Sequence, residues 1–343
     1  MLITKSGNGS VLDQILHFVC EFDGAAIPED ARHVMRLSLV DWVAVAVAGR
    51  NEPVAKILQR VGLSEGGTPE AFVIGCSRRL PARMAAKING TLSHALDYDD
   101  THFDSMGHTS VAVIPAALSL ADKLATPPMA FLEAILIGVE LAVRIGTWLG
   151  RPHYHAGFHM TATAGTFGAA MASARILDLS YEQTRHALGI AASMASGIKT
   201  QFGTMGKPLH AGLAANAGVD SALLALEGFV ATNDGLEGEQ GYSKTHHGAG
   251  DTHAFHDMGY DFVFERVSHK FHACCHGIHA TLEALAILRD KFSIQPEDIA
   301  ELVITVSPQY LNVCNIAAPM TGLEAKFSYR LVSALFMCGH DTA

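Results

Sequence analysis

From about Pro28 to Phe229 the sequence repeats one pattern: an apolar stretch of helical length, rich in alanine and glycine, that is closed by Gly, Pro or Asp. This pattern predicts a succession of closely packed helices. They are expected at residues 28–49, 80–97, 110–125, 129–149, 160–178, 181–198 and 209–229. The exception before residue 265 is the run Ala71-Phe-Val-Ile-Gly75, which is typical of a short β-strand.

The pattern changes after about residue 265. Residues 299–307 are rich in β-branched side chains and end at Pro308, which predicts a strand, and helices are expected at 276–292 and about 322–338. The sequence therefore predicts a mainly α fold with two parts. The first is a large all-helical domain over residues 1–265, and the second is a smaller α+β domain over residues 266–343.

Composition excludes several classes of protein. The chain has 343 residues, of which 49% are hydrophobic and 17% charged, but its apolar stretches are interrupted by residues such as Asp41 and Glu140, so no membrane span is expected. Residues 1–9 lack the pattern of a secretory leader, which favours a cytoplasmic location. A net charge of −10 argues against nucleic acid as a partner. The six cysteines form no C-x-x-C pair, so we expect reduced thiols and no zinc knuckle.

The first candidate site is the segment from His94 to His108, which contains Asp97, Asp99, Asp100 and Thr101. If the preceding helix continues to Thr101, residues 94, 97 and 101 lie on one helix face and can act together. Two other interpretations remain open from the residues alone. The first alternative is a solvated acidic helix end, and the second is a metal-binding loop.

Three further segments combine histidine with lysine or cysteine. His153 to His159 precedes an alanine-rich helix and has spacing that suits either zinc or an anion. Lys207 and His210 lie where a glycine-bearing loop enters a helix, a position that favours a carboxylate, although a solvated surface loop has the same features. The segment from Lys270 to His279 contains adjacent cysteines at 274 and 275, which serve either packing or reactivity.

Taken together and in this order, these segments resemble the MmgE/PrpD family. The resemblance rests on His94-Ala-Leu-Asp-Tyr-Asp-Asp-Thr, Gly107-His-Thr-Ser, Gly157-Phe-His, Gly203-Thr-Met-Gly-Lys-Pro-Leu-His-Ala-Gly and the stretch from Lys270 to His279, and it spans nearly the whole chain. It implies a helical domain, a smaller α+β lid, a homodimer, and an active site between the domains that uses neither cofactor nor metal. Since relatives continue beyond the position of Ala343, we expect this lid to be shortened.

The family pattern also implies roles for single residues. It places Asp97, Thr101, His108, His159, Lys207 and Lys270 around a small polycarboxylate substrate, with His210 and Cys275 as further contacts. Our hypothesis is that Lys207, Lys270 and His159 bind carboxylates, while His108, oriented by Asp97, transfers the proton. The chain departs from the pattern at Cys275, where some relatives have histidine, and at Leu331, where they have an aromatic hydroxyl.

The resemblance implies a lyase, and within it we favour a hydro-lyase similar to 2-methylcitrate dehydratase because of the breadth of the family. A decarboxylase of the cis-aconitate type and an epimerase of the iminodisuccinate type need the same carboxylate contacts and one proton shuttle. Two other classes of protein remain as alternatives. One is a non-catalytic polycarboxylate-binding remnant, and the other is a histidine-rich metalloprotein.

Overall fold

The computed structural model describes residues 10–342, and most of these residues are helical. The helices are α1 (Val11–Glu21), α2 (Glu29–Gly49), α3 (Pro53–Glu65), α4 (Ala82–Ser93), α5 (Ser110–Leu124), α6 (Pro128–Ala156), α7 (Met160–Ile176), α8 (Tyr181–Met194), α9 (Gly206–Leu226), α10 (Tyr242–Thr245), α11 (His276–Phe292), α12 (Pro308–Leu311), α13 (Gly322–Ala325) and α14 (Tyr329–Met337). The predicted mainly α fold is confirmed. Residues 1–9, on which the expectation about a leader rests, lie outside the described residues.

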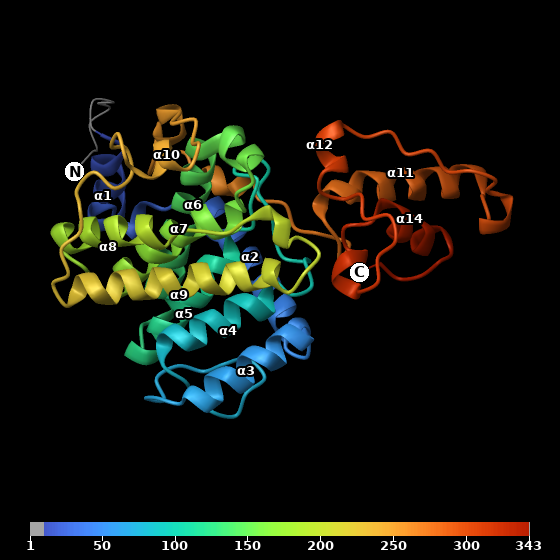
Figure 1. The fold of residues 1–343 in the computed structure, drawn as a ribbon. Helices are drawn as coiled ribbons and strands as arrows, with labels where there is room; N and C mark the ends of the chain where they lie inside the picture. The colour runs from blue at the N-terminus through green and yellow to red at the C-terminus, as the bar shows by residue number, and fades with distance from the viewer. Residues whose placement is uncertain (1–9, 343) are drawn as a thin grey trace.

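Helix α7 forms the centre of the helical body. Its side chains are buried continuously from Met160 to Ala174, as expected for a helix that has neighbours on every side. Helices α5, α6 and α9 pack directly against it, and α4 covers α9 (Figure 1). These central helices carry the alanine and glycine that raise the hydrophobic fraction of the sequence.

Two glycines show why small residues are needed in this core. A Cβ atom at Gly168 of α7 would lie 2.5 Å from the carbonyl oxygen of Gly138 in α6. A Cβ atom at Gly212 of α9 would lie 2.2 Å from the carbonyl oxygen of Lys87 in α4. Both distances are far below van der Waals contact, so the backbones can approach this closely only because these positions lack a side chain.

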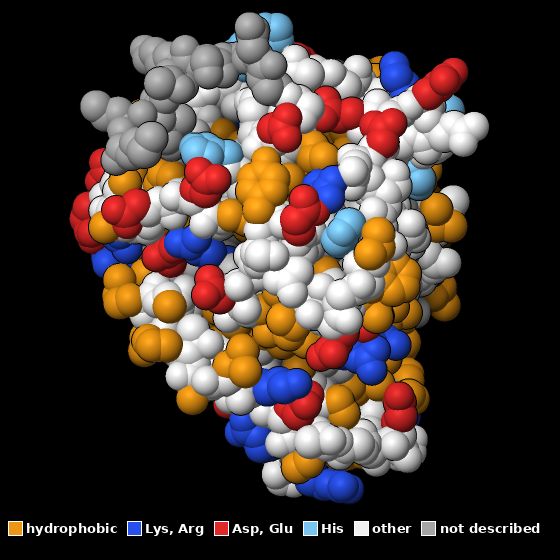
Figure 2. Space-filling view, turned by 90° about the vertical axis from the view of Figure 1, so that its left-hand side faces the viewer, with side chains coloured by type: hydrophobic (Ala, Val, Ile, Leu, Met, Phe, Trp, Pro, Cys, Tyr) orange, Lys and Arg blue, Asp and Glu red, His pale blue; other side chains and the backbone are white. Residues whose placement is uncertain are grey.

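Helix α9 is the one helix among residues 10–342 that is long and apolar enough to cross a membrane. Most of its apolar window is buried inside the protein, against α4, α7 and α8. Its composition is therefore explained by its central position. On the face of the helical body that is turned away from the C-terminal region, acidic and basic side chains are interspersed with apolar ones (Figure 2).

The C-terminal region lies to one side of the helical body (Figure 1). Helices α11 and α14 pack against each other there. They share a small core of buried side chains made by Cys274, Ile278, Leu282, Cys314, Tyr329 and Val332. The connection to the helical body is fixed by two backbone hydrogen bonds, in which Thr101 N donates to Ser268 O at 2.9 Å and Ser268 N donates to Thr101 O at 2.7 Å.

The strand predictions were wrong in the part of the chain that the structure describes. Residues 299–307 form no strand, because no neighbouring segment pairs with their backbone, although Ile304 and Val306 pack against the C-terminal core. The run 71–75 contributes only an isolated bridge between Ala71 and Leu80. The C-terminal region therefore consists of helices and loops, and its expected α+β character is not found among residues 266–342. The sequence analysis also missed α1 and α3.

Candidate active site

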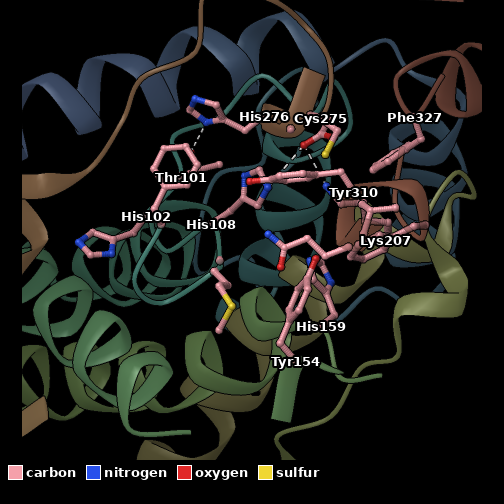
Figure 3. Close-up of a pocket in the computed structure, with 18 of the residues that line it drawn as sticks. Thr101, His102, His108, Tyr154, His159, Lys207, Cys275, His276, Tyr310 and Phe327 are labelled. Carbon is pink, nitrogen blue, oxygen red and sulfur yellow. Dashed lines mark hydrogen bonds and ion pairs between the residues drawn. The ribbon is translucent and has the colours of Figure 1, made fainter. Parts of the chain in front are cut away.

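A cavity of about 270 Å³ lies between the helical body and the C-terminal region (Figure 3). A space of this size suits a small molecule. The wall combines the loop after α4, the end of α6, the segment around the start of α9, the start of α11 and the region around α12. Predicted site residues in this wall are Asp97, Thr101, His108, His159, Lys207 and Cys275.

Asp97 occupies the turn that follows α4. The helix ends at Ser93, four residues before the predicted end at residue 97, so the condition that it continue to Thr101 is not met. Asp97 has a φ of 50°, a left-handed conformation that aspartate adopts more readily than most residues and that a continuing helix cannot contain. In this conformation its Oδ1 lies 2.9 Å from Nζ of Lys207 and 2.9 Å from Nζ of Lys270.

The two lysines bind the same carboxylate in different settings. Lys270 is fully covered and donates to three acceptors: Asp97 Oδ1, Asp97 O at 2.7 Å and Cys274 O at 3.1 Å. Its N–H groups are thereby used within the protein, so it lies behind the wall and ties the Asp97 turn to the C-terminal region. Lys207 is part of the wall itself, with its ammonium 5.4 Å from the ring centroid of Phe327. Of the two lysines, Lys207 is placed to meet a ligand.

His108 lies between two carboxylates. Its Nδ1 is 2.7 Å from Asp99 Oδ2, and its Nε2 is 3.5 Å from Asp97 Oδ1. Asp99 also accepts from Nδ1 of His94 at 2.9 Å. Asp99 is therefore the closer partner of the His108 ring, whereas the sequence hypothesis had assigned that role to Asp97. Asp97 is engaged mainly by the two lysines.

Burial determines the charge of this histidine pair. It lowers the pKa of His108, and the neighbouring Asp99 carboxylate partly offsets that effect. Burial likewise lowers the pKa of His94 to about 4. The pKa of Asp99 is held well below its usual value by both imidazoles, although burial opposes this. His108 is therefore neutral near pH 7 beside an ionised Asp99.

His159 and His210 form a second buried pair. Their Nδ1 atoms are 3.0 Å apart, so one ring donates a hydrogen bond and the other accepts it. Burial lowers the pKa of His210 to about 4 and that of His159 well below its usual value. His159 faces the cavity, whereas His210 lies behind it and is not part of the wall. The pair therefore presents a neutral imidazole to a ligand.

Thr101 and Cys275 complete the predicted set on the side of the C-terminal region. The hydroxyl of Thr101 is hydrogen-bonded to Nδ1 of His276, which is the first residue of α11 (Figure 3). Cys275 immediately precedes that helix and is partly exposed to the cavity. This wall therefore depends on how the C-terminal region is positioned.

Several residues in the wall were not given a role by the sequence analysis: Arg151, Tyr154, His155, His276 and Tyr310. Arg151 is an exposed cation near the rim, and its Nη1 lies 3.5 Å from Oε1 of Gln309. Its position next to the histidine segment 153–159 was the available signal. Tyr310 could not be found in this way, since it comes from a segment that was expected to follow a strand.

Among the described residues, His94, Asp97, Asp99 and His108 are close enough to share a metal ion, since their donor atoms lie within 4.8 Å of one another. Lys207 and Lys270 already neutralise Asp97 at 2.9 Å, and a divalent cation there would be repelled by two ammonium groups. The electrostatics of the cluster therefore favour an anion beside Lys207 over a cation at Asp97. The metal-free site stays a prediction.

Asp41 of α2 lies behind the site, where its Oδ2 accepts a hydrogen bond from the backbone N–H of Asp100 at 3.1 Å. Burial, together with the charges of Asp100 and Asp99, raises the pKa of Asp41 from 3.8 to about 7. Between pH 3.8 and about 7 the folded state therefore binds more protons at Asp41 than the unfolded state does. The contribution of Asp41 to the free energy of unfolding falls as pH rises through this interval.

We expect Asp41→Asn to remove this contribution while keeping an acceptor for the Asp100 N–H. Relative to the original chain, the variant should become progressively more stable between pH 5 and pH 8. Urea unfolding at both pH values, with Asp30→Asn on the exposed start of α2 as control, measures the difference. An unchanged difference between the two pH values would contradict the assignment.

The fold and the cavity define a class: an α-helical protein whose small-molecule site lies where a helical body meets a smaller C-terminal region, with lysine and histidine side chains in its wall. Comparison of the sequence with known proteins gives the family. Residues 13–254 match the MmgE/PrpD N-terminal domain, and residues 272–342 match the MmgE/PrpD C-terminal domain. The chain belongs to the MmgE/PrpD family, as its motifs suggested.

Curated relatives that match this chain are named cis-aconitate decarboxylase or cis-aconitate decarboxylase-like protein. A cis-aconitate decarboxylase-like protein, oryM, of Aspergillus oryzae is 28% identical over 332 residues, which cover 90% of this chain and 68% of the relative. The cis-aconitate decarboxylase of Aspergillus terreus is 27% identical over 306 residues, covering 84% and 61%. The cis-aconitate decarboxylase of Homo sapiens is 35% identical over 169 residues, covering 48% and 35%. The chain thus spans about two thirds or less of the length of these relatives.

Proposed function

We propose that the protein is a lyase that decarboxylates a small unsaturated tricarboxylic acid of the cis-aconitate type. The observation that carries the proposal is the placement of Lys207 and His108 in one cavity wall, both beside Asp97. The choice of decarboxylation is supported by the relatives named cis-aconitate decarboxylase. These relatives favour this reaction over the dehydration of 2-methylcitrate that we preferred on family breadth.

Lys207 is assigned to a substrate carboxylate. Its ammonium can exchange part of its interaction with Asp97 for a charge-assisted hydrogen bond to the ligand. His159 offers a neutral imidazole on the same wall, and Arg151 adds a positive charge at the rim. A substrate with three carboxylates can therefore meet a separate group at each of three positions.

His108 is assigned to proton transfer. Asp99 Oδ2 is the carboxylate oxygen nearest to Nδ1, at 2.7 Å, so we assign the ring hydrogen to that nitrogen and leave Nε2 to take up and deliver a proton. Entry of a polyanion raises the pKa of His108, since negative charge nearby favours the imidazolium. The histidine whose pKa is lowered by burial thus becomes the acid when substrate is bound.

The reaction balances with one proton. The bond between the departing carboxylate and its methylene carbon breaks and releases CO2. Its electron pair forms a new C=C bond, and the former C=C pair moves to the carbon beside another carboxylate. His108 protonates that carbon, while Lys207 stabilises the negative charge that builds up on the adjacent carboxylate. A tricarboxylate and one proton thus give CO2 and an unsaturated dicarboxylate.

A substrate panel tests this proposal. We expect CO2 release from cis-aconitate, with no comparable turnover of 2-methylcitrate or iminodisuccinate, when the purified chain is assayed with each. Water elimination from 2-methylcitrate without CO2 release would replace decarboxylation by the dehydratase reaction. Binding of all three acids without turnover would favour a non-catalytic protein.

We also propose that the protein is a homodimer and that α2 contributes to the contact. The outer face of α2 carries an apolar row, in which Leu37, Val40, Val43 and Val47 are 41–67% exposed. A row of this kind at helical spacing is suited to a partner helix. A second copy of the chain is the occupant that the family resemblance implies.

Val40→Glu is expected to shift the protein toward the monomer by at least tenfold in dissociation constant, because the change places a charge in an apolar contact. Sedimentation equilibrium measures the shift. Val230→Glu, at a position that is 75% exposed outside this row, is the matched control. A monomeric original chain, or a dimer unaffected by Val40→Glu, would rule out this contact.

A further inference from the structure

One histidine next to the site has no role in the proposed reaction. His94 is the C-cap residue of α4, is almost completely buried, and is not part of the cavity wall. Its ring lies 4.6 Å from the His108 ring and 5.9 Å from the His159 ring, measured between centroids. His94 therefore fills the space directly behind the two histidines that are assigned to proton transfer and carboxylate binding.

The buried Asp99 carboxylate connects His94 to His108. Nδ1 of His94 lies 2.9 Å from both oxygens of Asp99, and Nδ1 of His108 lies 2.7 Å from Asp99 Oδ2. Burial lowers the pKa of His94 to about 4, so this ring is neutral near pH 7. Because an ionised carboxylate only accepts hydrogen bonds, we assign the hydrogen of neutral His94 to Nδ1. One carboxylate is thus shared between two imidazole rings.

The other ring nitrogen of His94 shows what a histidine contributes at this position. Nε2 is buried and has no hydrogen-bond partner among the described residues. A buried nitrogen without a partner destabilises the folded state, and a hydrocarbon ring of similar size avoids that penalty. Such a ring cannot donate to Asp99, however. The contribution that is specific to histidine is therefore the hydrogen bond at Nδ1.

We propose that His94 is a positioning residue, which holds the Asp99 carboxylate beside His108 and limits how strongly that carboxylate attracts the proton of His108. The physical reason is that a carboxylate which accepts a hydrogen bond from one imidazole is a weaker partner for another. His94 thereby makes protonated His108 a stronger acid. The proposal rests on the proposed function, since it takes His108 as the group that transfers the proton.

Other charges also act on His108. The titratable and charged groups around it are His94, Asp97, Asp99, His159, Lys207 and Lys270. The two lysines disfavour a protonated His108, and burial disfavours it further. A change at His94 leaves the other groups in place, so its effect through Asp99 can be measured separately.

Titration of His108 tests the proposal without substrate. His94→Phe keeps an aromatic ring against His108 but removes the N–H donor, so the pH midpoint of the His108 titration should rise by about one pH unit. His94→Asn is the matched control, because its side-chain amide can still donate to Asp99, and it should raise the midpoint by less than half as much. NMR of 13C-labelled histidine follows the titration, and the His108 signal is identified by its absence in His108→Gln.

The Asp99→Asn background shows whether His94 acts through Asp99. With the carboxylate removed, the further change His94→Phe should leave the midpoint where Asp99→Asn alone places it. An equal rise in both backgrounds would show that His94 acts on His108 directly or by excluding water, and it would overturn the proposal. An unchanged or lower midpoint in His94→Phe would overturn it as well.

Two comparisons complete the test. If the phenylalanine ring prevents folding, His94→Met is a second variant without a donor, and it should also raise the midpoint. The expected rise in a protein that releases no CO2 from cis-aconitate would refute the proposed function and leave the action of His94 on His108 standing. CO2 release by the original chain, together with an unchanged midpoint in the donor-free variants, would refute the role of His94 alone.

Discussion

Replacing His108 with glutamine is expected to lower kcat by about 10²–10⁴-fold, the usual contribution of a positioned acid or base, with a much smaller change in KM. Glutamine keeps polar atoms near Asp97 and Asp99 but cannot carry the proton. The measurement is steady-state CO2 release from cis-aconitate. His253→Gln, an exposed histidine outside the cavity, is the control and should leave kcat unchanged.

A companion variant separates the proton carrier from the group that orients it. Asp99→Asn removes the carboxylate that is 2.7 Å from Nδ1 of His108, so kcat should fall and the pH at which the active form of His108 titrates should decrease. A His108→Gln variant with normal kcat would eliminate His108 as the acid. Lost activity in Asp99→Asn with an unchanged pH profile would assign Asp99 a purely structural role.

Asp97→Asn is expected to have the largest effect on stability, lowering the free energy of unfolding by about 3–5 kcal/mol, as is typical when one partner of a buried ion pair is removed. The reason is that Lys207 and Lys270 would both lose the negative charge of the carboxylate whose Oδ1 lies 2.9 Å from each ammonium. The covered Lys270 cannot regain water without opening the contact between the two regions.

Denaturant unfolding measures this effect. Asp104→Asn is a suitable control, because Asp104 also belongs to the cavity wall but its side chain is 58% exposed and interacts with the exposed Arg266. The control should change the stability by less than about 0.5 kcal/mol. Equal stability losses in the two variants would show that Asp97 does not hold the lysines as the structure indicates.

Much of the fold could be predicted from local patterns. Helices such as α2 and α5 were found within a few residues of their ends, because their apolar stretches are bounded by proline or by a charged last turn. Helix α3 was missed, since its polar residues 56, 59 and 60 break the apolar pattern. The segment 299–307 has strand propensity, but a strand also needs a neighbour, which local sequence does not specify.

The candidate site was predictable in membership but not in arrangement. The motifs identified Asp97, His108 and Lys207, which the structure brings together from two segments. Their partners could not be assigned, because the left-handed turn at Asp97 rotates its carboxylate toward the lysines and leaves His108 closest to Asp99. That rotation depends on tertiary contacts with Lys270 across the boundary between the regions.

Turnover of cis-aconitate in D2O, followed by NMR, tests the central claim most directly. The account predicts CO2 release and a dicarboxylate product with a single deuterium. The deuterium should lie on the carbon that carried one hydrogen in the former C=C bond and that becomes a methylene beside its carboxylate. The account also predicts loss of this signal in His108→Gln. Absence of CO2 release, or CO2 release with the solvent deuterium on a different carbon, would contradict it.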